Sequence, residues 1–256
     1  MAGHSTRSVA ILPTAVVHKS TANLPFPAIG TVAERRAKPV TGTLDEFLAR
    51  RWEDLVTLTL QHLAVVALSL ALATVLGVLI GLLVWDRNVP RTAALTAAGI
   101  AITIPSLALL ALLSPILGLG WAPTVVSLVF YSLLPIVRNT VVGLREVPAH
   151  VIESARGMGM TPAKTLLSIQ LPLAWPVIVT GIRVAAQLTV GIAAIAAYVA
   201  GPGLGFYIFK GLSSLGSVNA LNFALTGTLC VVLLALLIDG AFVLIARYST
   251  SRGLRV

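Results

Sequence analysis

The chain has 256 residues, of which 57% are hydrophobic and only 11% are charged. Soluble domains usually carry about 25% charged residues, so the composition excludes an ordinary soluble protein and indicates one embedded in a membrane. The formal net charge of +9 comes from basic residues scattered between apolar runs. Nucleic-acid binding needs a basic face interleaved with aromatic residues, which is missing, so we expect lipid and not nucleic acid as a partner.

Cysteine and histidine are too sparse to suggest a metal centre or a disulfide. Cys230 is the only cysteine, and the histidines stand far apart at His4, His18, His62 and His150. The sequence has no Gly-x-x-x-x-Gly-Lys-[Ser/Thr] loop for cradling phosphates, and its apolar segments hold no nucleophile–base pair or pair of carboxylates. We therefore expect no cofactor and no enzymatic activity in this polypeptide.

The first part of the chain differs from the rest. Residues 1–42 lack a sustained hydrophobic period and are predicted to be a disordered extension. The apolar run from Ile11 to Val17 is too short, and too broken by Pro13, for a signal peptide. Residues 43–57 mix leucine and phenylalanine with acidic and basic residues, which predicts an amphipathic segment at the membrane interface.

The remainder, 58–256, is predicted to be an all-α polytopic membrane domain with about five transmembrane helices. The predicted spans are about 58–84, 93–113, 122–142, 175–200 and 221–246. Gly77 and Gly81 in the first span permit close contact with another helix. Residues 92–137 contain no charge and are too many for one helix, so we divide them near Pro115 and Pro123. Pro105 is expected to kink the second span without ending it.

Tryptophan and basic residues predict where the spans end and how they are oriented. The tryptophans lie near the predicted ends, at Trp52, Trp85, Trp121 and Trp175. Basic residues mark the turn at 85–91, the loop at 146–172 and the C-terminus. The positive-inside rule makes these segments cytoplasmic. An external N-terminus follows from five spans, although Arg35, Arg36 and Lys38 conflict with it.

Two charges fall inside predicted spans. Arg183 lies about 10 Å into the fourth span and Asp239 about 12 Å before the end of the fifth, at 1.5 Å per residue. Because these helices run in opposite directions, the two side chains are expected at similar depth and are predicted to pair, within one subunit or across a dimer. Alternatively, Arg183 snorkels to the headgroups while Asp239 faces water or meets Arg138.

The loop at 146–172 is predicted to form two short helices. Pro148 suits the first position of one helix, and Gly157 or Gly159 can end it with positive φ. Thr161 can cap the second helix and Pro162 can occupy its first turn. Pro172 is expected to end it. Composition does not distinguish this segment from an ordinary cytoplasmic loop.

The spacing within the loop does distinguish it. It resembles the coupling loop of bacterial ABC-importer permeases, which has Glu-Ala-Ala, then Gly, then Ile-x-Leu-Pro. The matching residues here are Glu153, Ser154, Ala155, Gly159, Ile169, Leu171 and Pro172. Ser154 for the first Ala is the one departure. The resemblance implies that this loop, with Gly157, Thr161 and Pro162, docks into a separate ATPase.

The resemblance extends from about Leu55 to Leu254 and is strongest to the permeases of osmoprotectant importers. It rests further on the stretches 134–140, 191–198 and 203–211. It implies the type I ABC-importer permease fold in the cytoplasmic membrane of a prokaryote. It also implies two ATPase copies, a second permease chain and an extracytoplasmic substrate-binding protein. The implied solute is a quaternary ammonium compound such as glycine betaine.

Other functions stay open at this point. A permease of the same superfamily could carry methionine or another small metabolite. An ion-coupled secondary carrier would need ionisable residues along an ion path and inverted repeats. Arg183 and Asp239 are the candidates for such a path, and no inverted repeat is apparent.

Overall fold

The computed structural model describes residues 43–249, and every regular element in that range is a helix. The predicted disordered extension, 1–42, lies outside the described residues. The helices are α2 (Leu44–Arg50), α3 (Trp52–Val84), α4 (Asn88–Thr103), α5 (Ser106–Leu117), α6 (Trp121–Arg145), α7 (Ala149–Gly157), α8 (Pro162–Thr165), α9 (Leu171–Ile195), α10 (Gly205–Ser213) and α11 (Ala220–Ser249). A π-helical turn, Leu166–Gln170, joins α8 to α9, and a 3₁₀ turn, Ala196–Val199, follows α9.

Several of these helices are long and apolar enough to cross a membrane. Four continuous helical stretches meet that requirement: Trp52–Val84, Trp121–Arg145, Pro162–Val199 and Ala220–Tyr248. The pair α4 and α5 makes up to a fifth span, although these two helices are bent by 93°. The chain is therefore an all-helical, multi-pass membrane protein with four or five spans in the described range.

The second span differs from its prediction. We expected one kinked helix over about 93–113, but the helix breaks between Thr103 and Ser106. Pro105 forces the residue before it out of helical geometry, and Ile104 is extended with φ −70° and ψ 126°. The carbonyl of Ile104 then accepts a hydrogen bond from the hydroxyl of Tyr131 on α6. The steric effect of the proline thus breaks the helix, and the neighbouring helix α6 supplies a partner for the carbonyl that the break leaves free.

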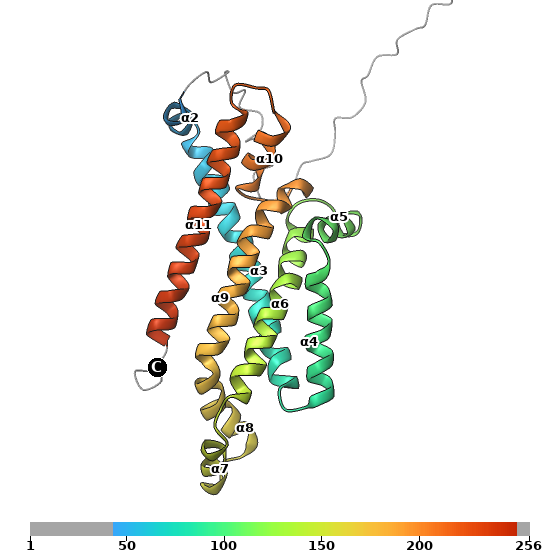
Figure 1. The fold of residues 1–256 in the computed structure, drawn as a ribbon, viewed down its shortest axis with the longest axis vertical. Coiled ribbons are helices and arrows are strands. Elements are labelled where there is room, and N and C mark those ends of the chain that lie inside the picture. The colour runs from blue at the N-terminus through green and yellow to red at the C-terminus, as the bar shows by residue number, and fades with distance from the viewer. Residues whose placement is uncertain (1–42, 250–256) are drawn as a thin grey trace, which may run out of the picture. The chain divides into compact units, whose positions relative to one another are not determined.

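The short helices and the turns lie at the two ends of the helical bundle. In Figure 1, α2, α5 and α10 lie at one end, and α7, α8 and the α3–α4 turn lie at the other. We call these the α10 end and the α7 end. The α3–α4 turn, the α7–α8 segment and the last turn of α11 carry basic residues, and all lie toward the α7 end. This is the grouping of basic segments that the sequence predicted.

The centre of the bundle is α6, which packs against α9 on one side and α3 on the other. Glycines permit this close approach. A Cβ at Gly77 would lie 2.7 Å from Ile136 Cγ2, and one at Gly81 would lie 2.5 Å from Thr140 Cγ2. The Gly77–Gly81 pair therefore contacts α6.

The amphipathic segment at 43–57 is divided by Arg51 into α2 and the start of α3. Phe47 on α2 is fully buried, and its ring lies 4.9 Å from that of Phe223 on α11. Two cations flank the ring of Phe223: Arg51 at 4.9 Å and Lys210 at 4.5 Å. Burial, and secondarily the charge of Arg51, lowers the pKa of Lys210. Aromatic contacts of Phe47 thus hold α2 against α10 and α11. Arg51 and Lys210 add cation–π contacts to the same group of rings.

The close α3–α6 contact gives a testable prediction. Gly77→Val should lower the thermal stability of the purified protein, because overpacking a closed contact typically costs about 1–3 kcal/mol. Gly99→Val is the matched control, since a Cβ at Gly99 on α4 meets nothing within 4 Å. Thermal unfolding in detergent should separate the two variants. Equal melting temperatures would show that the contact at Gly77 is looser than the structure has it.

Candidate functional site

The connection between α6 and α9 begins with α7. Pro148 lies at the N-cap with extended backbone (φ −61°, ψ 137°), one residue earlier than the sequence predicted. Gly157 is the last helical residue, and Gly159 ends the helix with φ +77°. The N–H of Gly159 donates to the carbonyl of Arg156 (2.9 Å) and that of Met160 to the carbonyl of Ala155 (3.1 Å). These bonds form a Schellman motif, whose C′ position favours glycine because a Cβ opposes its positive φ.

The next helix, α8, starts within two residues of that turn. Thr161 has extended backbone, and its hydroxyl oxygen accepts a hydrogen bond from the backbone N–H of Lys164 at 3.3 Å. Pro162 is the first helical residue, as its fixed φ and missing N–H favour. The turn and the cap fix the angle between α7 and α8, and both helices lie at the α7 end of the bundle (Figure 1).

Pro172 does not end the second helix, contrary to the sequence prediction. The helical stretch continues from Pro162 to Val199. In an α-helix the ring of Pro172 would clash with the carbonyl of Ser168. Here residues 166–170 form a π-turn, in which the N–H of Leu171 donates to the carbonyl of Leu166. The wider turn, and the position of Pro172 in the first turn of α9, accommodate the ring. The part of the loop from Pro162 onward is therefore one continuous helical stretch with the fourth span.

The predicted coupling residues divide into an exposed and an inward set. Glu153, Ser154, Gly157, Gly159, Thr161 and Pro162 are exposed. Ala155 is fully buried, and Ile169 and Leu171 are partly buried where the loop joins α9. The hydroxyl of Ser154 donates to the carbonyl of His150 at 2.8 Å, so serine replaces alanine here without an unsatisfied polar group. The exposed set can contact a partner, whereas the inward set holds the loop to the bundle.

Two exposed apolar side chains lie beside the exposed set. Met158 is 73% exposed and Leu167 is 60% exposed, although both lie in the polar connection between α6 and α9. Neither belonged to the predicted site. Large apolar groups that project from polar helices are typical of protein–protein contacts, so the α7–α8 segment has the composition of a docking surface.

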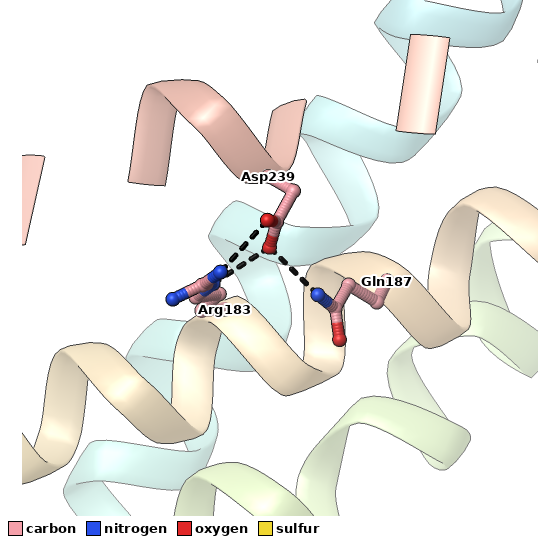
Figure 2. Close-up of polar contacts among 3 residues, drawn as sticks. All are labelled: Arg183, Gln187 and Asp239. Atoms are coloured by element: carbon pink, nitrogen blue, oxygen red, sulfur yellow. Dashed lines mark hydrogen bonds and ion pairs between the residues drawn. The ribbon is translucent and has the colours of Figure 1, made fainter. Parts of the chain in front are cut away.

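A second polar site joins α9 to α11 within the spans. Arg183 donates from Nε to Asp239 Oδ1 at 2.6 Å and from Nη2 to Asp239 Oδ2 at 2.7 Å, as Figure 2 shows. The structure thus brings together the two residues that the sequence analysis paired, and Asp239 contacts Arg183 and not Arg138. The arrangement is bidentate, which fixes the angle between the two side chains.

Sequence reasoning missed a third member of this network. Gln187 donates from Nε2 to Asp239 Oδ1 at 2.7 Å (Figure 2). It lies four residues after Arg183, and therefore on the same face of α9. That four-residue spacing was the sequence signal that could have indicated that Gln187 joins the network. The Arg183 side chain is 37% exposed and that of Asp239 is 27% exposed, so the network lies at the surface of this chain and not in its core.

The described residues contain no group of three or more His, Cys, Asp or Glu side chains that could hold a metal ion. What the structure offers is a helical membrane domain, the exposed α7–α8 segment at one end, and a helix that runs from that segment into the spans. These features are those expected of the membrane-spanning subunit of a multi-protein assembly.

Comparison with known proteins identifies that assembly. Residues 55–249 match the family described as binding-protein-dependent transport system inner membrane component, and the chain belongs to this family. Members of the family work with an ATPase and a substrate-binding protein. The chain is thus a permease component of an ABC importer.

The similarity to individual relatives extends over nearly the whole length of each relative. The choline transport system permease protein OpuBB of Bacillus subtilis is 35% identical over 210 residues, which cover 82% of this chain and 95% of the relative. The osmoprotectant import permease protein OsmW of Salmonella typhimurium is 38% identical over 206 residues, covering 78% and 94%. Among solved structures, an inward-facing MetNI methionine ABC transporter matches with a TM-score of 0.66 at 26% identity, covering 77% of this chain and 96% of that chain. The fold is that of an ABC-importer permease.

The network on α9 and α11 predicts coupled effects of mutation. Arg183→Ala and Asp239→Ala should each lower the melting temperature, because each leaves a partner charge uncompensated. The double variant should lose less than the sum of the two single losses. Gln187→Ala should have the smallest effect, since the bidentate bond remains. Strictly additive losses in a thermal-unfolding series would contradict the pairing.

Proposed function

We propose that this chain is the permease of an importer for a quaternary ammonium osmoprotectant, such as choline or glycine betaine, in the cytoplasmic membrane of a prokaryote. The observation that supports this solute class is similarity to relatives that carry such names. Permeases named for choline, for osmoprotectants and for glycine betaine, carnitine and choline are 34–38% identical to the chain. The transporter named for methionine is 26% identical.

We propose in addition that the α7 end is cytoplasmic and that α7 and α8 dock on the ATPase. The basic segments at this end support that orientation through the positive-inside rule. The exposed residues of the segment, from Glu153 to Pro162, supply the contact, together with the exposed side chains of Met158 and Leu167. A movement imposed on α8 reaches α9 directly, because the helix is continuous through the π-turn.

The assembly that fits these features has two permease chains, two ATPase copies and one extracytoplasmic binding protein. A chain of four or five spans forms one half of such a pathway, and a second permease chain supplies the other half. In this arrangement the Arg183–Asp239 pair braces α9 against α11 near the docking segment.

Competition for uptake tests the solute class. Cells that lack their own osmoprotectant importers should accumulate radiolabelled choline or glycine betaine when this chain is expressed with its ATPase and binding protein. Unlabelled choline, glycine betaine or carnitine should compete, and methionine should not. Accumulation of radiolabelled methionine, without accumulation of choline or glycine betaine, would favour the second candidate, a methionine permease, which the MetNI match supports.

The Schellman turn gives a sharp test of docking. Gly159→Ala should lower capture of the ATPase by about tenfold, because a Cβ at positive φ costs about 1–2 kcal/mol and changes the angle between α7 and α8. Uptake should fall with capture, while the amount of protein in the membrane stays the same.

Gly157→Ala is the matched control for Gly159→Ala. A Cβ at either glycine meets nothing within 4 Å, but Gly157 is helical and Gly159 has φ +77°. Pull-down of the ATPase and solute uptake should be near normal in the Gly157 variant. Equal behaviour of the two variants would show that backbone conformation at Gly159 does not control docking.

A further inference from the structure

One face of α9 stays uncovered by the other helices of the described range 43–249. From Thr180 to Tyr198, the exposed residues are Thr180, Val184, Gln187, Gly191 and Tyr198. They recur every three, four or seven residues, and Arg183, whose side chain is 37% exposed, lies on the same face. A Cβ at Gly191 would meet nothing within 4 Å, so the surface is open at that point. Val184 is the one large aliphatic side chain in this row.

The uncovered face of α3 has the opposite character. Between residues 60 and 83 its exposed side chains are all aliphatic: Leu60, Leu63, Ala64, Ala67, Leu68, Ala71, Leu72, Val75, Leu76, Leu79 and Leu83. Such a face suits lipid, which offers no hydrogen bonds. The two faces belong to the same chain and cross the same depth, so the difference between them reflects different surroundings.

The polar groups on α9 are too deep to reach the headgroups. Gln187 lies about 18 Å along the helix from Trp175, at 1.5 Å per residue, which is near the middle of a hydrocarbon core about 30 Å thick. Its side chain is short, and Figure 2 shows its carbonyl oxygen turned away from Asp239. Arg183 cannot snorkel freely while two of its nitrogens are held by Asp239. Lipid would leave these groups without hydrogen-bond partners.

We propose that the face from Thr180 on α9 to Tyr198 on the following 3₁₀ turn lines the water-filled translocation pathway. Water supplies partners for the outward groups of Gln187 and Arg183, and it fills the open space at Gly191. A dry seam against a second protein is disfavoured, because the ion pair is already complete within one chain and needs no counter-charge from a partner. The inference rests on the chain being a permease, but not on the identity of the solute.

The single cysteine makes this face accessible to experiment. Cys230→Ala leaves the chain without a thiol. Into this background, cysteine is introduced singly at Thr180, Gln187 or Gly191 on α9, and at Leu68, Leu72 or Val75 on α3 as matched controls. Thr180 and Gly191 lie outside the ion-pair network, so their variants test the face even if loss of Gln187 disturbs the fold.

The full transporter, with its ATPase and binding protein, is then treated in right-side-out and in inside-out vesicles with a membrane-impermeant methanethiosulfonate reagent. Thiols react with it as thiolates, which form in water and not in lipid. The α9 cysteines should react at least about tenfold faster than the α3 cysteines in one or both vesicle orientations. Rates no faster than those of the α3 controls would overturn the proposal, as would cross-linking of α9 cysteines between copies without labelling. Labelling does not depend on uptake, so a wrong solute assignment would not be mistaken for a wrong pathway.

Discussion

The structure depends on the continuity of one helix. From Pro162 to Val199 the chain is helical without interruption, although Pro172 would break an ordinary α-helix. The π-turn at residues 166–170 removes the clash by widening the helix ahead of the proline. α8 and the polar face of α9 are therefore parts of one continuous helix, which would carry a displacement of α8 to α9 in the proposed docking.

Close packing holds this element in place. α9 lies against α6 because Gly181 has no side chain where a Cβ would lie 2.7 Å from the carbonyl oxygen of Pro135. α6 in turn lies against the glycines of α3, and the Arg183–Asp239 pair ties α9 to α11. Interiors packed in this way shift between discrete arrangements more readily than they deform. Such a bundle suits a permease that alternates between two states.

The features that sequence reasoning located are those set by local chemistry or by a simple count along a helix. The positive φ of Gly159, the cap by Thr161 and the meeting of Arg183 with Asp239 are of this kind. The features that it missed depend on contacts with other helices or on backbone geometry that the local residue pattern does not specify. Pro105 breaks its helix where Tyr131 can bond the freed carbonyl, whereas Pro172 is absorbed by a π-turn. No local pattern distinguishes the two prolines. The exposure of Gln187 likewise follows from which side of α9 the other helices cover.

The central claim is that ATP, through a separate ATPase, drives solute through this chain. Its most direct test is reconstitution of the permease, the ATPase and the binding protein in proteoliposomes. Solute accumulation and ATP hydrolysis are measured together, with and without an imposed ion gradient. The account predicts that solute-loaded binding protein raises both rates and that collapse of the gradient leaves them unchanged. Accumulation that follows the gradient and continues without ATP would contradict it and would identify an ion-coupled carrier.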